Sequence, residues 1–428
     1  MKIAIISSGF LPVVDGVTVS IFQRVRVLSK LGHQVLILCP DYQSVASVYP
    51  NWRDYQGEIL PGVRVVNLPS EPFMGVEFER NLSRQANRLL DQELTAFAPD
   101  IVHVDEPDRI FLGTLKAPGV AYAKAHNIPC VGFYHTNFID YIEDFWPLPR
   151  ILVAFLQWFS MLFIRPVFHA YDAILVSSPV TLEKMRQLKV RNVVCDRYLG
   201  VDVQAFRAAR LDSDPNFFAK AYGIKGLQGR TKLVLLGRLT PDKGWGFTVR
   251  SLIAWADRLK ANPQTAPLLN KIALIIAGEG DLRDHIQTQL QPLAGSTGLS
   301  VHLLGRIPPA AVPPLLANSD IHVTTSEKET LGLTVLEAFA AGIPAIAPAK
   351  GGVVTHIRHG ENGLLFEPQK AESFGEALTR LAFDPQLQQR LGQQAQQDIT
   401  DYDWETVVLR LLSTWERQIR MRSPAVDN

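Results

Sequence analysis

Three cysteines, an almost neutral charge balance and the lack of any long apolar run limit what this chain can be. Cys39, Cys130 and Cys195 are not spaced as the ligands of a zinc site. So few cysteines in 428 residues argue against a disulfide framework and suit the reducing cytosol. The formal net charge is +1, from 43 Lys and Arg against 42 Asp and Glu. The chain lacks the basic excess of nucleic-acid-binding proteins, so no nucleic-acid partner is expected.

Membrane spans, low-complexity tracts and internal repeats are also lacking in the sequence. The most apolar run covers positions 151–164, between two arginines, and is shorter than the roughly 20 residues that a spanning helix needs. The N-terminal sequence MKIAIISSGF has too short an apolar run for a signal peptide. We expect it to form the first strand, and we expect no segment to cross a membrane.

The chain does contain a regular alternation of short β-branched runs and helical patterns. The predicted strands are KIAII, QVLILCP, DIVHV, PCVGFYH and AILVSS, followed by KLVLLG, IALIIAG, VHLLG and IHVTTS. After the first run, a helical pattern places Ile21, Val25 and Leu28 on one face and ends at Gly32. This alternation predicts an α/β protein built from βα units with parallel sheets.

Length and pattern together indicate two domains. At about 150 residues per domain, a chain of this length allows two or three. Periodicity fails over 207–232, where polar residues, glycine and proline collect. The predicted domains are therefore 1–206 and 207–402, both doubly wound and Rossmann-like. Such a pair predicts a cleft facing the carboxyl ends of both sheets, where ligands bind in open α/β folds.

The stretch ETLGLTVLEAFAAG, positions 329–342, follows a predicted strand and indicates a phosphate site. We expect Thr330 to cap a helix over 331–341 that Gly342 ends. In its first turn, Gly332 lets a ligand approach the unpaired amides and the positive end of the helix dipole. The positions expected at this phosphate are Thr330, Leu331, Gly332 and Leu333.

Two glutamates, Glu329 and Glu337, flank the expected phosphate. Glu337 lies about 9 Å along the helix axis at 1.5 Å per residue, a reach that suits hydroxyl groups beyond the phosphate. We expect Glu329 to hold a sugar and Glu337 a ribose, because carboxylates accept hydrogen bonds from hydroxyls. The alternatives are a solvated loop acid for Glu329 and a surface helix position for Glu337.

The stretch LLGRLTPDKGWG supplies two cations, Arg238 and Lys243, directly after another predicted strand. The pair is suited to clamping a diphosphate, and the alternative is ordinary surface charge. Later strands also end in glycine, and these glycines are Gly278, Gly280 and Gly305. The backbone at Arg306 and Ile307 is expected either to contact a nucleobase or to form a plain turn.

Three of these motifs together resemble the retaining nucleotide-sugar glycosyltransferases of family four, which have the GT-B fold. They are "GR" with a lysine five residues on, AGEGDLR, and the spaced acids of ETLGLTVLE. The resemblance covers most of the chain and implies that Arg238 and Lys243 hold the diphosphate, Glu329 the donor sugar and Glu337 the ribose. It also implies that a last helix, over 403–428, returns to the first domain.

The first half supplies less specific candidates at strand ends. Gly16 is expected to approach the donor through its backbone, although many relatives have two adjacent glycines where Asp15 and Gly16 stand here, and Asp15 is expected to face the acceptor instead. His135 follows a strand where the family pattern has a histidine near the donor sugar; the alternative is a core histidine. Asp105 and Glu106 are further candidates for acceptor contacts.

The resemblance implies a reaction in which the leaving diphosphate itself takes the acceptor proton, so that no protein nucleophile is required. The expected catalytic residues are His135, Arg238, Lys243 and Glu329. No cofactor is expected. Metal is expected to be dispensable, because two cations can replace one and no Asp-x-Asp pair lies beside the phosphate position.

The acceptor and the donor base are less defined. The aromatic stretch over 145–168 suits a bilayer surface, and equally a buried helix or a dimer contact. Similarity to sulfolipid synthases and phosphatidylinositol mannosyltransferases favours a lipid acceptor and a UDP-sugar donor, at the cytoplasmic face of the membrane. A soluble sugar or sugar-phosphate acceptor is the alternative within the same class. A nucleotide-sugar binder without activity and an epimerase of the same fold are alternatives from other classes.

Overall fold

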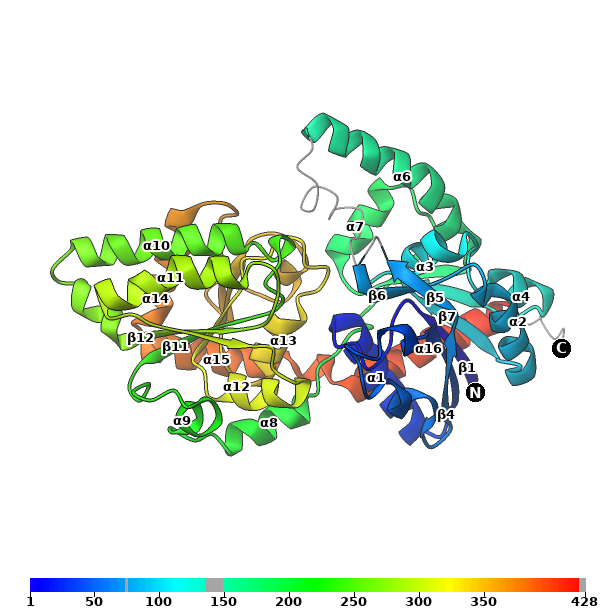
Figure 1. Ribbon diagram of the computed structural model, residues 1–428, viewed down its shortest axis with the longest axis horizontal. Coiled ribbons are helices and arrows are strands. Elements are labelled where there is room, and N and C mark those ends of the chain that lie inside the picture. The colour runs from blue at the N-terminus through cyan, green and yellow to red at the C-terminus, as the bar shows by residue number, and fades with distance from the viewer. Residues whose placement is uncertain (74–75, 136–148, 423–428) are drawn as a thin grey trace. The chain divides into compact units, whose positions relative to one another are not determined.

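The computed structural model describes residues 1–73, 76–135 and 149–422 (Figure 1). The chain forms two compact units, the first made of Met1–Gly200 with Trp404–Asn428 and the second of Val201–Asp403. The predicted boundary at 206/207 lies six residues later than this division. The segment 207–222, predicted to lack periodicity, is largely helical, with α8 (Val203–Leu211) and α9 (Phe217–Tyr222). The prediction missed α8 because its buried residues begin before that window.

The first unit is built on an eight-stranded sheet that is parallel except for one edge strand. In sheet order the strands are β10 (Val193–Cys195), β9 (Ala173–Val176), β8 (Cys130–Phe133), β7 (Ile101–Asp105), β1 (Lys2–Ser7), β2 (Gln34–Pro40), β4 (Val63–Leu68) and the antiparallel β3 (Gly57–Leu60). A separate hairpin joins β5 (Ser70–Phe73) and β6 (Val76–Leu82). The five strands predicted in this half are present, and β3, β4, β5, β6 and β10 were not predicted.

Helices cover both faces of this sheet (Figure 1). They are α1 (Gly16–Lys30), α2 (Ala86–Phe97), α3 (Pro107–Thr114), α4 (Val120–Ala125), α6 (Arg150–Ala170), α7 (Pro179–Gln187) and α16 (Trp404–Arg422). As predicted, α1 buries Ile21, Val25 and Leu28. The last helix, α16, packs against α1 and buries Trp415 completely. The first unit is thus completed by the end of the chain.

The second unit has a six-stranded, fully parallel sheet. In sheet order the strands are β13 (Ser300–Gly305), β12 (Ile272–Ala277), β11 (Thr231–Leu236), β14 (Ile321–Val323), β15 (Ala345–Pro348) and β16 (Gly363–Phe366). Besides α8 and α9, its helices are α10 (Trp245–Ala261), α11 (Arg283–Thr297), α12 (Val312–Ala317), α13 (Leu333–Ala340), α14 (Ala371–Ala382) and α15 (Pro385–Asp398). The central strands are almost wholly buried, which explains their continuous apolar sequence.

Each sheet has one point where the strand order reverses. In the first unit the chain builds outward from β1 to β2 and β4, then returns to the other side of β1 with β7. In the second unit it builds from β11 to β12 and β13, then returns beside β11 with β14. Ligands in open α/β sheets bind at the carboxyl ends of the two strands that flank such a point. The candidate ligand-binding residues are therefore those after β1 and β7, and those after β11 and β14.

Candidate functional site

In the second unit, a lysine and a glutamate meet at the point where the strand order reverses. Lys243 follows β11 and Glu329 follows β14, 86 positions later; the lysine Nζ lies 2.7 Å from the carboxylate Oε1 of Glu329. Both side chains are about three-quarters buried. Two residues predicted from separate motifs are therefore brought together, and neither matches the alternative of a fully solvated surface charge.

The loop after β11 holds its two cations through a buried aspartate and a tight turn. Asp242, whose side chain is 1% exposed, accepts a hydrogen bond from Arg238 Nη2 at 3.3 Å. The backbone carbonyl of Arg238 accepts the indole N–H of Trp245 at 2.8 Å. Gly244 has a left-handed conformation, and a Cβ there would lie 2.7 Å from the carbonyl oxygen of Thr325. The guanidinium of Arg238 is half exposed, so it is accessible to a ligand.

The two glutamates of the 329–342 stretch have opposite electrostatic environments. Burial alone would raise the pKa of Glu329, but the charge of Lys243, hydrogen bonds from Lys243 and Ser326, and the charge of Arg238 together lower it. Glu329 is therefore an anion suited to accept hydrogen bonds from sugar hydroxyls. Glu337 lies on the predominantly apolar helix α13, and burial raises its pKa to about 7. A ligand with two adjacent hydroxyls would favour the ionised form of this group.

The mouth of α13 differs in one respect from the sequence prediction. The N-cap is Gly332 rather than Thr330, and the helix begins at Leu333. Gly332 has a left-handed conformation, with φ of 84°, and a Cβ there would lie 2.6 Å from Val353 Cγ1. No capping side chain covers the first amides of α13. At the other end, Gly342 is left-handed and follows the C-cap, as expected.

Leu331 is buried, so that only its backbone is available at this position. The structure places it beside Thr330 and Gly332 in the loop between Glu329 and α13. A phosphate contact with these four backbone positions, Leu333 included, stays a prediction.

Glycines close the carboxyl ends of β11, β12 and β13. Gly237 N–H donates to the carbonyl of Ala277, and Gly278 N–H donates to the carbonyl of Gly305. A Cβ on Gly278 would lie 1.8 Å from the carbonyl oxygen of Gly237, so only glycine fits there. Arg306 and Ile307 directly follow β13, at the same edge of the sheet, and Arg306 is exposed. Their contact with a nucleobase stays a prediction.

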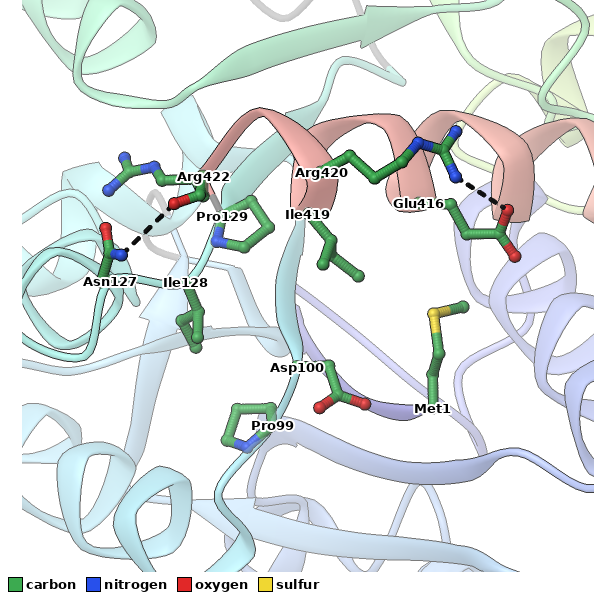
Figure 2. A pocket seen from close by; sticks show the side chains of 10 residues that line it. All are labelled: Met1, Pro99, Asp100, Asn127, Ile128, Pro129, Glu416, Ile419, Arg420 and Arg422. Atoms are coloured by element: carbon green, nitrogen blue, oxygen red, sulfur yellow. Dashed lines mark hydrogen bonds and ion pairs between the residues drawn. The ribbon is translucent and has the colours of Figure 1, made fainter. Parts of the chain in front are cut away.

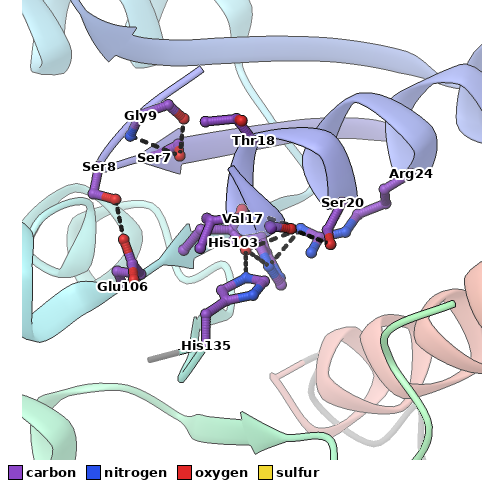
Figure 3. Close-up of polar contacts among 12 residues, drawn as sticks. Ser7, Ser8, Gly9, Val17, Thr18, Ser20, Arg24, His103, Glu106 and His135 are labelled. Atoms are coloured by element: carbon purple, nitrogen blue, oxygen red, sulfur yellow. Dashed lines mark hydrogen bonds and ion pairs between the residues drawn. The ribbon is translucent and has the colours of Figure 1, made fainter. Parts of the chain in front are cut away.

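In the first unit, His135 and Asp105 meet at the carboxyl ends of β8 and β7. Figure 3 shows His135 and its neighbour His103. His135 Nε2 lies 2.5 Å from Asp105 Oδ1, and His135 is 6% exposed. Asp105 is completely buried. No part of its carboxylate reaches the surface, and its predicted contact with an acceptor stays a prediction. Asp105 lies behind His135 as a hydrogen-bond partner.

The neighbouring acid, Glu106, is also buried and has a strained backbone. Its φ of 57° lies in the left-handed region, which is unusual for a residue with a side chain. It accepts a hydrogen bond from the hydroxyl of Ser8, which follows β1, and its Oε2 lies 3.8 Å from Arg109 Nη1. With 5% exposure, Glu106 has little surface for an acceptor. It nevertheless lies at the reversal point of this sheet.

Asp15 caps α1. Its Oδ1 accepts the amide hydrogens of Val17 and Thr18, at 2.9 and 2.8 Å. These two amides are therefore bonded to the chain's own carboxylate. Asp15 and Gly16 are both exposed at this turn, and the acceptor contact of Asp15 and the donor contact of Gly16 stay predictions.

Sequence reasoning missed the residues that surround Asp105. Arg24 on α1, His103 on β7 and Trp415 on α16 all belong to its buried cluster. His103 and Asp105 are two positions apart on one strand and so point to the same face, which was the available signal. Arg24 and Trp415 come from distant segments, and no sequence motif links them to Asp105.

The first unit also contains a hollow of about 520 Å³ (Figure 2). It is lined by residues at the amino ends of the strands, among them Met1, Asp100 and Pro129, together with Glu416 and Arg420 of α16. It is therefore at the opposite edge of the sheet from the ligand position expected for this fold. Among the residues that the structure describes, no group of three or more His, Cys, Asp or Glu side chains could hold a metal ion.

Comparison with known proteins gives matches along nearly the whole chain. A model described as Glycosyltransferase Family 4 matches residues 14–205, and one described as Glycosyl transferases group 1 matches residues 223–398. The chain is 28% identical to a GDP-mannose-dependent alpha-mannosyltransferase of Mycolicibacterium smegmatis, over 99% of each chain. It is 26% identical to the alpha-monoglucosyldiacylglycerol synthase of Streptococcus pneumoniae, over 81% of this chain and 71% of that one.

Solved structures agree on the fold. Sucrose-phosphate synthase from Thermosynechococcus elongatus superposes with a TM-score of 0.75 at 19% identity, over 99% of this chain and 100% of that one. The predicted fold class, an α/β chain with two Rossmann-like units, is confirmed.

Proposed function

Because the chain is a glycosyltransferase of family four with the GT-B fold, and so transfers a sugar from a nucleotide sugar, we propose that it is a retaining enzyme that moves a hexose to a hydroxyl of a membrane glycerolipid. The observation that carries the donor half of this proposal is the contact between Lys243 and Glu329 at the reversal point of the second sheet. It puts a cation for a diphosphate beside an ionised acceptor for sugar hydroxyls.

The donor is held by charge and by hydrogen-bond acceptors of the second unit. Lys243 has three N–H donors, so it can keep its bond to Glu329 while it contacts a phosphate. Arg238 adds a second, half-exposed cation, and the uncapped start of α13 adds backbone amides. Glu329 accepts hydrogen bonds from hydroxyls of the hexose, and Glu337 accepts hydrogen bonds from hydroxyls of the ribose.

These groups favour the departure of the diphosphate. Negative charge grows on it as the sugar leaves, and the preorganised cations stabilise that charge. The diphosphate oxygen then takes the proton of the acceptor hydroxyl, which attacks the same face of the sugar. The proposal needs neither a protein nucleophile nor a metal ion.

The donor base is the first point to resolve. The sequence resemblance favours UDP, whereas the mannosyltransferase relative named above uses GDP-mannose. Thermal-shift measurements with UDP, GDP and ADP and their sugars would separate these donors, because a ligand that binds only the folded state raises its stability. The nucleotide that raises the melting temperature most carries the base of the donor.

A lipid acceptor is supported by the surface of α6. Seven large apolar side chains on this helix are between 41% and 87% exposed, namely Ile151, Leu152, Phe155, Trp158, Phe159, Leu162 and Phe163. From position 151 they recur at intervals of about four residues, and so they share one face of the helix. The opposite face, with Ile164, Val167 and Phe168, is packed into the first unit.

The helix α6 is longer than the apolar run in the sequence. By length and composition, Ile151–Ala170 could span a membrane, although the apolar run alone is shorter. Its packed face and the projection of its N-terminal half from the first unit (Figure 1) instead suit a helix that lies in a bilayer surface. The first four positions of the predicted 145–168 stretch lie outside the described residues.

Phe155, Trp158, Phe159 and Phe163 contact one another along the exposed face, with ring centroids 5.1–6.1 Å apart. A helix face of Trp, Phe and Leu is typical of helices that lie in the interface of a bilayer. No Asp or Glu occurs in α6, so the helix itself brings no negative charge to an anionic membrane. The three unpaired cysteines are consistent with the cytoplasmic face.

The proposal is tested by activity and by membrane binding. Purified protein is incubated with the donor found above and with vesicles of phosphatidylglycerol and diacylglycerol, or with soluble sugars and sugar phosphates, and products are identified by mass spectrometry. A glycosylated lipid with the anomeric configuration of the donor is expected. Transfer to soluble acceptors only would favour the soluble alternative, and isomerised donor would favour an epimerase. Binding without turnover would favour a protein that binds the nucleotide sugar only.

The surface of α6 is tested separately with Phe155→Ser/Trp158→Ser. Each side chain contributes about 1.5–3 kcal/mol when fully buried, so co-sedimentation with vesicles should weaken by 100-fold or more. The control Leu211→Ser/Leu409→Ser removes exposed apolar side chains elsewhere, 87% and 53% exposed, and should bind like the wild type. Unchanged vesicle binding with a changed oligomeric state would show that α6 is a contact between copies.

A further inference from the structure

Arg24, His103 and His135 lie close together (Figure 3), and all three contact Asp105. Oδ1 of Asp105 lies 2.5 Å from His135 Nε2 and 3.3 Å from His103 Nε2. Arg24 Nη1 lies 3.1 Å from Oδ2 and 3.2 Å from Oδ1. Arg24, His103 and Asp105 are all completely buried. Burying a charge pair beside two histidines costs free energy unless hydrogen bonds satisfy the charges. The position of this cluster at the sheet edge therefore indicates a role beyond packing.

His103 lies between Arg24 and the C-terminal helix. The indole N–H of Trp415 lies 3.3 Å from His103 Nδ1, and Arg24 Nη1 lies 2.9 Å from His103 Nε2. An indole and a guanidinium can only donate, so both ring nitrogens of His103 face donors. Burial lowers the pKa of His103 to about 4, so this ring is neutral near pH 7.

Asp105 in turn determines the hydrogen position on His135. Burial alone would raise the pKa of Asp105, but the charges of Arg24 and His103 and the hydrogen bonds from both histidines hold it well below its usual value. An ionised carboxylate can only accept hydrogen bonds. His135 must therefore carry a hydrogen on Nε2, and its Nδ1 is the ring nitrogen that faces away from Asp105.

We propose that Asp105 is a positioning residue that fixes the ring of His135 with its hydrogen on Nε2. The inference rests on the proposed function only in taking His135 as the group beside the donor sugar.

The first test needs no variant at Asp105. Histidine rings labelled with ¹⁵N are observed by long-range ¹H–¹⁵N correlation in the full chain, and His135→Gln assigns the His135 signals. A hydrogen on Nε2 is expected for His135. A neutral His135 ring with its only hydrogen on Nδ1 would overturn the proposal.

The second test compares Asp105→Asn with the control Asp172→Asn. An amide can donate or accept, so Asp105→Asn should give His135 a second form with its hydrogen on Nδ1. We expect kcat to fall about 10- to 100-fold, the range seen when the partner that orients a histidine is removed, with the donor KM little changed. Asp172 lies before β9 at the amino end of the sheet, where it bonds Cys130 N–H and Arg422, and its change should affect neither quantity.

If Asp105→Asn does not fold, the ring spectra of the wild-type protein still decide the hydrogen position on His135. If His135→Gln turns over like the wild type, the role of His135 in the proposed function fails, while the ring spectra still decide the part of Asp105.

Discussion

Glu337 offers a test in which stability and ligand binding should change in opposite directions. The perturbation is Glu337→Gln, which keeps the shape of the side chain but cannot ionise. Burial raises the pKa of Glu337 from its usual 4.5 to about 7. Between these values the folded protein binds more protons than the unfolded chain, so the free energy of unfolding falls as pH rises.

The size of the effect follows from that change in pKa. At 1.36 kcal/mol per pKa unit, ionising Glu337 in the folded state costs about 3 kcal/mol, and the whole cost is present above pH 7. The glutamine variant avoids it. Wild type and variant should be equally stable near pH 4.5, and the variant should be more stable by up to about 3 kcal/mol at pH 8.

Urea unfolding of both proteins at several pH values measures the difference in their free energies of unfolding. Other titrating groups contribute equally to both proteins and so cancel. Glu376→Gln, an exposed change on α14, is the control and should show no pH-dependent difference from wild type. A difference between Glu337→Gln and wild type that does not vary with pH would refute the reasoning about burial.

The same variant should bind its donor more weakly. Loss of charge-assisted hydrogen bonds to the ribose hydroxyls removes about 1.5–3 kcal/mol, or roughly 10- to 150-fold in Kd. Isothermal titration with the donor nucleotide measures this. A more stable variant with unchanged affinity would show that Glu337 does not contact the ribose.

Three other predictions concern the donor half. Arg238→Ala and Lys243→Ala should each lower kcat by 100-fold or more, about 3 kcal/mol, with near-native circular dichroism; wild-type turnover in either would remove that cation from the site. Gly278→Ala should destabilise by several kcal/mol, because its Cβ would lie 1.8 Å from the Gly237 carbonyl oxygen, whereas Gly295→Ala, with open space around it, should be neutral or stabilising in thermal denaturation. EDTA should leave transfer unchanged in product assays; inhibition reversed by Mg²⁺ or Mn²⁺ would contradict a metal-free reaction.

Much of the fold could be predicted because the central strands are buried on both faces and therefore appear as continuous apolar runs. The run QVLILCP, for example, coincides with β2, Gln34–Pro40. The strands that were missed are short or lie toward sheet edges. β10 and β3, for instance, contain three and four residues and no fully buried position. Such strands depend on pairing with neighbours more than on their own sequence.

The candidate site was predictable where a motif and a strand end coincide. Lys243 and Glu329 both follow strands, and parallel strands bring their carboxyl ends to one edge. The sequence could not show that Asp15 would satisfy the amides of its own helix or that Asp105 would be buried. Both outcomes depend on side-chain packing. Nor could it pair Trp415 with His103, which lie 312 positions apart.

The return of α16 to the first unit has a consequence for how the protein is made. A ribosome releases the first 200 residues long before α16, the helix that covers α1. In the nascent N-terminal unit, α1 therefore stays uncovered until α16 has been synthesised. The second unit is continuous and can fold during this interval. Stop codons that remove only the last 25 residues should therefore leave the N-terminal half dependent on chaperones, although every residue of the donor site has already been translated.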